Sequence, residues 1–273
     1  MSQSIEQPVG GESPPPPTNR RGLAIAAGAA VLLVATALGV WLLLPKPSAP
    51  PAAPAWQQEA IGASVQGKPI VAYRFGKGER RVLILGGVHG DEFGADAAEQ
   101  LIQRLKDSPE SVPEGVEISV IPVVNPDGRE ALTRGNSQGV DINRNMPSKN
   151  WASKLNKKDS SGKRGLQGGA APGSEPESQA VMGYLDRGFA AVVSLHSKGG
   201  IIDFDGPGGE ALAQRVAEKA GLPVEHVAYQ PYVTGSMGLF VPEKYTVPVI
   251  TVELESPDLS PQMEQAILLP AMQ

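Results

Sequence analysis

The sequence predicts an α/β sandwich with a mixed, mostly parallel sheet, preceded by one transmembrane helix. From residue 56 onward, short apolar runs of strand length alternate with longer segments of helical periodicity, which is typical of this class. Polar residues that could serve a site directly follow several of the apolar runs. The membrane helix is predicted by the 23 residues of 22–44, which contain no charge.

The N-terminal region contains a polar tail, the apolar segment and a linker. Residues 1–21 include four consecutive prolines and are expected to be disordered. Residues 22–44 would form a helix of roughly 34 Å, enough to cross a hydrocarbon core of about 30 Å. Residues 45–55 are dominated by Pro and Ala, which favours an extended, stiff spacer. We therefore expect a signal anchor and a stalk before a globular domain at 56–273.

The orientation and fate of the apolar segment depend on its flanks. Arg20 and Arg21 precede it and Lys46 follows it, so the positive-inside rule favours an inside N-terminus and an outside C-terminus. A cleaved signal peptide is an alternative because Ala53-Pro54-Ala55 has small residues, although such peptides have apolar cores of only about 7–15 residues. A twin-arginine export signal is another alternative. Each interpretation places the downstream domain outside the cytoplasm, as a single-pass membrane protein in the first case.

Within the globular part we expect six strands and four helices. The strands are apolar or alternating runs bounded by turn residues, and the first two form a hairpin around Gln66-Gly67-Lys68-Pro69. The expected strands are Ile61–Val65, Ile70–Phe75, Val82–Gly86, Val116–Val124, Ala190–Leu195 and Val247–Leu254. The helices have apolar residues at helical spacing, with Ser174 as the expected N-cap of the second. The expected helices are Gly94–Leu105, Ser174–Leu185, Glu210–Ala220 and Pro261–Leu269.

Composition excludes several classes of function. The formal net charge is −5, and a mildly acidic chain gives no support for binding nucleic acid. The chain contains no cysteine, which excludes disulfides and thiolate ligands to a metal. The absence of cysteine does not by itself identify a cellular compartment.

The most informative stretch is His89-Gly90-Asp91-Glu92, which directly follows the apolar run 82–88. A second histidine, His196, follows the apolar run 190–195 in the same way. Because sites of α/β folds lie at the carboxyl ends of strands, these side chains can meet at one point. Two imidazoles and one carboxylate make the ligand set of a catalytic zinc, which leaves a coordination position for water. Other divalent ions can also occupy such a site.

A zinc hydrolase also needs a general base and a cation that stabilises a developing oxyanion. Glu253 is the candidate base, because a carboxylate within a β-branched apolar run is costly unless it serves a site or a partner. Glu255 has the same strand parity and is its rival. Arg134 and Arg144 flank a loop rich in Gly and Asn, and their guanidinium groups suit carboxylates and oxyanions. Asn143 adds an amide to this loop.

Five motifs, in this order, resemble the zinc carboxypeptidase family, and the resemblance spans about residues 58–270. The motifs are His89-x-x-Glu92, Asn125-Pro126-Asp127-Gly128, Asp141-Ile142-Asn143-Arg144-Asn145, Ser194-Leu195-His196-Ser197 and Thr251-Val252-Glu253-Leu254. Each motif is weak alone, whereas all five in order are a strong indication. The resemblance implies a three-layer α/β/α sandwich with a zinc carboxypeptidase-like sheet, and a metalloprotease that binds one Zn²⁺ per chain.

The resemblance also implies the catalytic roles of the matching residues. His89, Glu92 and His196 would hold zinc. Glu253 would act first as the general base and then as the acid that protonates the leaving amine. Arg134 would polarise the scissile carbonyl.

Further residues would bind the substrate. Asn143 and Arg144 would bind the free carboxylate of its terminal residue, and Met237 corresponds to the specificity pocket. Since Met237 is not acidic, a strict preference for Lys or Arg is not expected. Tyr232 is the candidate for the tyrosine that covers the substrate in this family, with Tyr229 as a competitor.

Within the family, three further stretches resemble bacterial murein peptide amidases. They are residues 134–141, Pro172-Gly173-Ser174-Glu175-Pro176-Glu177-Ser178 and Phe204-Asp205-Gly206-Pro207. Those enzymes cut the γ-D-glutamyl–meso-diaminopimelate bond of cell-wall peptides, so a murein peptide is the expected substrate. The alternatives are a general carboxypeptidase acting on protein C-termini, a deacylase of N-acyl amino acids, and a non-catalytic, membrane-anchored module that binds the cell wall.

Overall fold

A computed structural model describes residues 55–154, 167–227 and 233–272. The expected tail, membrane helix and all but the last residue of the linker lie outside these ranges. Among the described residues, no helix combines the length and the apolar character that crossing a membrane requires. The transmembrane expectation for 22–44 therefore remains a prediction.

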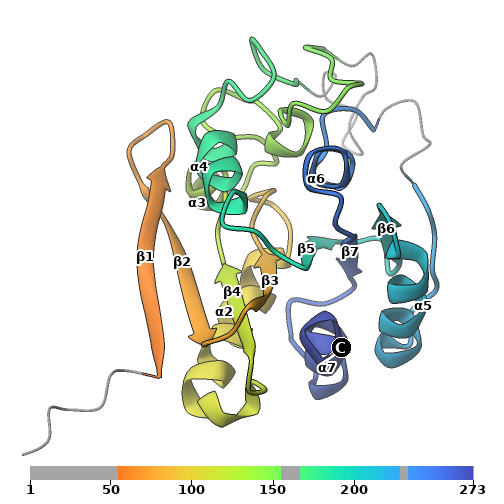
Figure 1. Ribbon diagram of the computed structural model, residues 1–273. Coiled ribbons are helices and arrows are strands. Elements are labelled where there is room, and N and C mark those ends of the chain that lie inside the picture. The colour runs from red at the N-terminus through yellow and green to blue at the C-terminus, as the bar shows by residue number, and fades with distance from the viewer. Residues whose placement is uncertain (1–54, 155–166, 228–232, 273) are drawn as a thin grey trace, which may run out of the picture. The chain divides into compact units, whose positions relative to one another are not determined.

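The centre of the described domain is a seven-stranded sheet with the order β1-β2-β4-β3-β5-β7-β6 (Figure 1). The strands are β1 (Trp56–Ala63), β2 (Pro69–Gly76), β3 (Arg80–Leu85), β4 (Val116–Ile121), β5 (Ala191–Ser197), β6 (Ile202–Asp205) and β7 (Val249–Leu254). Strands β4, β3, β5 and β7 are parallel to their neighbours within this central group, whereas β1, β2 and β6 pair antiparallel. The sheet is mixed, as predicted, but it is mostly parallel only in its four central strands.

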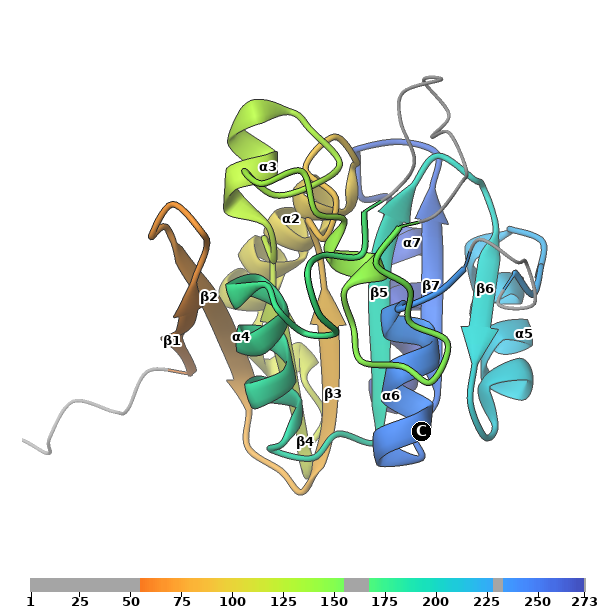
Figure 2. The same cartoon turned by 90° about the horizontal axis from the view of Figure 1, so that it is seen from above.

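Helices cover both faces of the sheet, which gives the three expected layers (Figures 1 and 2). The helices are α2 (Gly94–Asp107), α3 (Pro126–Ala131), α4 (Pro176–Leu185), α5 (Gly209–Ala220), α6 (Met237–Tyr245) and α7 (Pro261–Leu268). One core cluster joins the sheet to α2, α5 and α7, and a second joins its other face to α4 and α6. Every residue of β5 is buried, which explains why its sequence is apolar on both faces without alternation.

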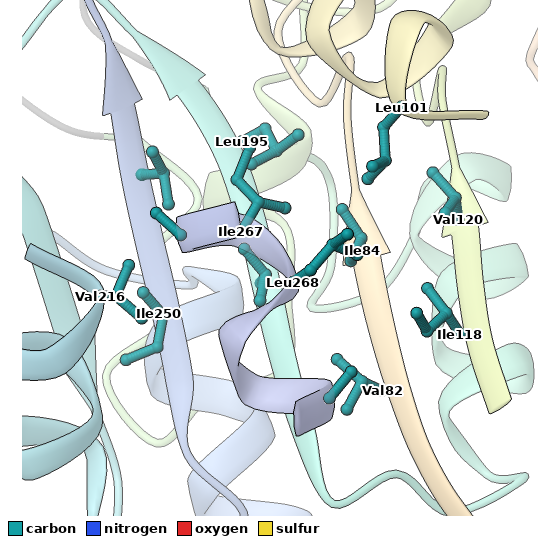
Figure 3. Packing of buried hydrophobic residues seen from close by; sticks show 14 of the residues in the cluster. Val82, Ile84, Leu101, Ile118, Val120, Leu195, Val216, Ile250, Ile267 and Leu268 are labelled. Carbon is teal, nitrogen blue, oxygen red and sulfur yellow. The ribbon is translucent and has the colours of Figure 1, made fainter. Parts of the chain in front are cut away.

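The first core cluster is densely packed around α7 (Figure 3). Ile267 of α7 is fully buried, and Leu101 of α2 is fully buried against the same face of the sheet. Ile84 and Val120 contribute from neighbouring strands. This packing fixes the central strands and therefore the positions of the polar residues at their carboxyl ends.

Several expectations about single elements are corrected by the structure. Helix α4 begins at Pro176 with Glu175 as its N-cap, and the Ser174 hydroxyl instead donates a hydrogen bond to the Glu175 carboxylate. Residues 126–131 form the short helix α3, to which the sequence analysis assigns no element, and Asn125 caps it by accepting a hydrogen bond from the backbone N–H of Gly128 at 2.9 Å. Strand β6 and helix α6 were not predicted at all.

Candidate active site

His89, His196 and Glu253 lie at the carboxyl ends of the central strands. His89 follows β3, while His196 lies in β5 and is paired in register with Glu253 of β7. Helix α2 begins at Gly94, where an added Cβ atom would lie 2.0 Å from the carbonyl oxygen of Leu195. Because only glycine permits this approach, the start of α2 lies directly against β5. The contact brings Glu92, two residues before the helix, next to His196.

Three side chains form a compact group that could hold a metal ion. Nδ1 of His89 and Nδ1 of His196 are 3.0 Å apart. The Glu92 carboxylate is 2.9 Å from the first of these nitrogens and 3.0 Å from the second. Their ligand atoms all lie within 4.8 Å of one another, and both imidazoles are 2 % exposed. The convergence of two imidazole nitrogens and a carboxylate at one point is the arrangement that a zinc site requires.

The outward-facing nitrogens of both imidazoles are bound by other side chains. Nε2 of His89 is 3.1 Å from the carboxylate of Asp141, and Nε2 of His196 is 2.9 Å from the hydroxyl of Ser194. A proton on each Nε2 would satisfy these contacts and leave the Nδ1 lone pairs free for a metal. Asp141 and Ser194 thus orient the ligands, a role that the sequence reasoning did not assign to them.

The guanidinium group of Arg134 lies beside the metal-binding group. Its Nε donates to Asp141 at 2.9 Å and its Nη1 donates to Glu92 at 3.0 Å. The Arg134 side chain is 29 % exposed, so part of it remains accessible to a ligand. Burial disfavours the charged form of Glu92, but the imidazoles of His89 and His196 outweigh it and hold the pKa of Glu92 far below its ordinary value.

Glu253 lies on the same face of the sheet as His196, since directly paired residues of neighbouring strands share a face. Its backbone is fixed on both sides, because Glu253 N–H donates to the Ile201 carbonyl at 3.0 Å and its carbonyl accepts from Gly200 N–H at 2.9 Å. Glu253 is partly exposed, whereas its rival Glu255 lies beyond the end of β7 and is exposed. This geometry favours Glu253 over Glu255 as the candidate general base.

The residues expected to bind the substrate's carboxylate form a short turn at residues 142–144. The turn is capped by Asp141, which accepts a hydrogen bond from Asn143 N–H at 2.9 Å. The side-chain oxygen of Asn143 in turn accepts from the backbone N–H of Met237 at 2.8 Å. Arg144 is 7 % exposed and Met237 is 1 % exposed. Tyr232 and its competitor lie outside the described residues, so their placement stays a prediction.

Comparison with known proteins agrees with this geometry. A family model described as zinc carboxypeptidase matches residues 55–219. Murein peptide amidase A of Escherichia coli (strain K12) is 32 % identical over 188 residues, which cover 66 % of this chain and 74 % of that protein. The protein of the same name from Vibrio campbellii is also 32 % identical, over 71 % of this chain and 78 % of its own length.

Solved structures give the same result for the fold. The murein-tripeptide amidase MpaA from Escherichia coli O157 has a TM-score of 0.67 and 29 % identity, covering 84 % of this chain and 97 % of that one. Bovine thrombin-activatable fibrinolysis inhibitor, at 20 % identity and a TM-score of 0.64, shares the fold over 80 % of this chain and 89 % of its own. The family match, the relatives and the His-Glu-His group lead to one conclusion: this chain belongs to the zinc carboxypeptidase family and is a zinc-dependent hydrolase.

Proposed function

We propose that this protein hydrolyses the amide bond between γ-D-glutamate and meso-diaminopimelate in murein peptides. The observation that supports the chemistry is the convergence of His89, Glu92 and His196 beside the guanidinium of Arg134. The substrate is supported by the relatives that are named murein peptide amidase A. A peptide substrate also agrees with the family to which the chain belongs.

The donor set fits zinc by its chemistry. Two imidazole Nδ1 atoms and one carboxylate face one point, and both Nε2 atoms already have partners. Three protein ligands of this kind are typical of catalytic zinc sites, whereas structural sites are closed by four. Zinc held by these residues would supply the Lewis acidity that makes water nucleophilic near neutral pH.

We assign the proton transfers to Glu253. Its carboxylate takes a proton as the oxygen of the attacking water bonds to the carbonyl carbon, and it delivers that proton to the amine when the C–N bond breaks. Arg134 donates hydrogen bonds to the oxyanion that develops on the carbonyl oxygen. The new carboxyl group gives up the second proton of the water to the released amine, so the products are a carboxylate on the glutamyl side and an ammonium group on the released residue.

We assign the binding of the released residue to the turn at residues 142–144 and to α6. Asn143 and Arg144 would bind its free carboxylate, since an amide and a guanidinium both donate to carboxylate oxygens. Met237 would line the pocket for its side chain, and Tyr232 would cover the substrate. Bidentate anchoring of the carboxylate fixes the scissile bond against the metal-binding group.

We further propose that residues 22–44 anchor the chain in a membrane and that residues 45–55 hold the catalytic domain, 56–273, on its outer side. The proposal is supported by the uncharged length of the segment and by the basic residues that precede it. A cell-wall substrate would be accessible to a domain in that position.

The full-length protein, purified in detergent and loaded with zinc, tests the activity. It is incubated with L-Ala-γ-D-Glu-meso-diaminopimelate, with an ordinary peptide, and with an N-acyl amino acid, and the products are followed by mass spectrometry. We expect release of diaminopimelate from the first substrate. Glu253→Gln should abolish it while zinc remains bound, whereas the matched variant Glu255→Gln should stay active.

Other outcomes would identify the alternatives. Cleavage of only the ordinary peptide would indicate a general carboxypeptidase, and cleavage of only the N-acyl amino acid a deacylase. Binding of the murein peptide without turnover, unchanged in Glu253→Gln, would indicate a non-catalytic cell-wall-binding module. Each of these results contradicts the proposed function.

A further inference from the structure

The connection between β5 and β6 begins beside the metal-binding group and passes over the candidate base. Ser197 N–H donates to the carboxylate of Glu92, 3.2 Å from Oε2, and the Ser197 hydroxyl accepts from Phe93 N–H at 3.0 Å. Two residues further on, a Cβ atom added to Gly199 would lie 3.0 Å from Cβ and 3.1 Å from Cγ of Glu253. The backbone on both sides of the residue between Ser197 and Gly199 is therefore held against the site.

That residue is Lys198, and its side chain lies over an aromatic ring at the rim of the site. Nζ of Lys198 is 5.2 Å from the centroid of the Phe93 ring, and Phe93 directly follows the predicted metal ligand Glu92. Lys198 is exposed and Phe93 is partly buried. Because a cation is attracted to the face of an aromatic ring, Phe93 keeps the ammonium group close to the metal-binding group.

The ammonium group of Lys198 is available to bind an anion. Within the part of the chain that the structure describes, it makes no hydrogen bond and no ion pair. The guanidinium group of Arg134, by contrast, already donates to Asp141 and Glu92. An exposed lysine is usually a solvated surface residue, but the backbone around Lys198 is held by the site itself. A substrate bound at the site would therefore lie within reach of this ammonium group.

Lys198 and the residues assigned to the released residue lie on opposite sides of the metal-binding group. Phe93 packs with α2 against the first core cluster, whereas Met237 of α6 belongs to the second cluster, on the other face of the sheet (Figures 1 and 2). Asn143, which would bind the carboxylate of the released residue, accepts from Met237 N–H. A substrate held there would extend its acyl part across the metal-binding group toward Phe93. Lys198 would thus face the residue that precedes the scissile bond.

We propose that Lys198 binds a carboxylate on the residue that precedes the scissile bond and thereby favours γ-D-glutamyl substrates. The proposal rests on the proposed function, in which that residue is D-glutamate linked through its γ-carboxyl group. Its α-carboxylate is then free, and in the tripeptide it is the one negative charge on the acyl side. An ammonium group forms a charge-assisted hydrogen bond with such a carboxylate.

The dimensions agree with this assignment. Four C–C bonds separate the scissile carbonyl carbon from the α-carboxyl carbon, an extended length of about 5 Å. The side chain of Lys198 adds a reach of roughly 6 Å from its Cα atom, and the hydrogen bond adds about 3 Å. Since the N–H of Ser197 already contacts Glu92, these lengths allow the pair to form without movement of the backbone.

The test compares two substrates that differ only in the charge of this group. The full-length zinc enzyme is assayed with L-Ala-γ-D-Glu-meso-diaminopimelate and with the analogue in which the α-carboxylate of D-glutamate is a carboxamide of the same size. We expect kcat/KM of the wild type to be about three- to tenfold lower on the carboxamide, as for an ion pair that is partly exposed. Raising the ionic strength should reduce the difference, because salt screens exposed charges. Equal values at low ionic strength would overturn the proposal.

Lys198→Met removes the charge and nearly keeps the length of the side chain. It should lower kcat/KM on the carboxylate substrate to about the value on the carboxamide, whereas Lys198→Arg should retain the preference. The matched control is Lys106→Met, because Nζ of Lys106 also lies over an aromatic ring, 4.2 Å from the centroid of Trp56, but in the last turn of α2, at its far end from the site. A preference that persists in Lys198→Met, or that Lys106→Met removes as well, overturns the assignment.

A failure of the proposed function is distinguishable from a failure of this inference. If neither murein substrate is cleaved, peptides with glutamate or glutamine before the C-terminal residue repeat the comparison, because that side-chain carboxyl carbon is also four C–C bonds from the scissile carbonyl carbon. A preference for glutamate that Lys198→Met removes would retain the role of Lys198 on a different substrate, and no preference would overturn the inference together with the proposed function.

If none of these substrates is turned over, the dissociation constants of the two murein tripeptides decide. Tighter binding of the carboxylate form that Lys198→Met abolishes would support the inference, and equal binding of the two forms to the wild type would overturn it.

Discussion

Asp141 lies at the edge of the His89 imidazole that points away from the metal-binding group, with 3.1 Å between its carboxylate and Nε2. Its second oxygen accepts from Nε of Arg134 at 2.9 Å. One carboxylate thus orients a predicted metal ligand and the predicted oxyanion-binding cation together. Burial disfavours the charged form of Asp141, but Arg134 and His89 outweigh it and hold the pKa of Asp141 well below its ordinary value.

We therefore predict that Asp141→Asn weakens zinc binding by about 10–100-fold, because residues that orient metal ligands typically contribute this much. Competition with a chelator of known affinity measures the change. The matched control is Asp127→Asn. Asp127 is also buried and accepts from Ser64 and Ser137, but the structure shows no contact between it and His89. Equal zinc affinities of the two variants would contradict the role of Asp141.

The contact between α2 and β5 gives a second prediction. In Gly94→Ala the new methyl group would meet the Leu195 carbonyl at 2.0 Å, so the helix must move away from the strand. We expect a loss of about 1–3 kcal/mol in the free energy of unfolding. Zinc affinity should fall as well, since Glu92 and His196 separate. Thermal unfolding with and without zinc measures both effects.

Gly183→Ala is the control for this variant. Gly183 also lies in a helix, α4, but a Cβ atom added there has no neighbour within 4 Å. The substitution should raise stability by about 0.5–1 kcal/mol, because alanine is the better helix former. If Gly94→Ala behaved like Gly183→Ala, the close approach of α2 to β5 would not be what holds the two ligands together.

The sequence predicts the two histidines of the metal-binding group because each lies at the end of an apolar strand. The apolar runs before His89 and His196 are buried on both faces of the sheet. The polar residues that follow them therefore lie where these strands end, at the carboxyl side of the sheet. Ser194 could have been found in the same way, because it lies two residues before His196 and thus on the same face. Asp141 could not, since its contact with His89 joins positions 52 residues apart and depends on how a loop folds.

Strand β6 and helix α6 are the parts of the fold that sequence reasoning missed. Strand β6 has only four residues and two of them are aspartates, which hides the apolar pattern of a strand. Helix α6 contains Gly238 and Pro242, both unfavourable in a helix interior, and is held by its packing on β6 and β7. The sequence analysis thus names the motif Phe204-Asp205-Gly206-Pro207, but none of its expected strands or helices contains Asp205.

The proposed membrane anchor leads to a prediction about accessibility. Because the chain has no cysteine, single cysteines can report the two sides of residues 22–44. We expect a membrane-impermeant maleimide to label Ser48→Cys in spheroplasts, and Ser4→Cys only after the membrane is permeabilised. Labelling of Ser4→Cys in intact spheroplasts would contradict the proposed orientation. A mature chain that lacks both cysteines would indicate a cleaved signal peptide.

The raised pKa of Asp205 predicts a dependence of stability on pH that the asparagine variant should remove. Burial and the negative charge of Asp203 raise the pKa of Asp205 to about 7 in the folded protein, against an ordinary value of 3.8. The folded state therefore binds the proton more tightly than the unfolded state, and stability falls as the pH rises from about 4 to about 7. Above about pH 7 the charged carboxylate of Asp205 lowers the free energy of unfolding by roughly 2–4 kcal/mol.

Asp205→Asn should thus be more stable than the wild type at pH 8, by an amount that shrinks through this window and disappears near pH 4. Chemical denaturation of both proteins in the presence of a chelator measures the difference without the contribution of zinc. Asp203→Asn should show a smaller gain of the same sign, because burial also raises the pKa of Asp203 and because its negative charge contributes to the raised pKa of Asp205. A stabilisation of Asp205→Asn at pH 8 that disappears near pH 4 would confirm that the charged form of this buried carboxylate lowers the stability of the fold. Equal stability of the two proteins at pH 8 would contradict the raised pKa of Asp205, because a carboxylate with an ordinary pKa carries its charge in both the folded and the unfolded state at that pH.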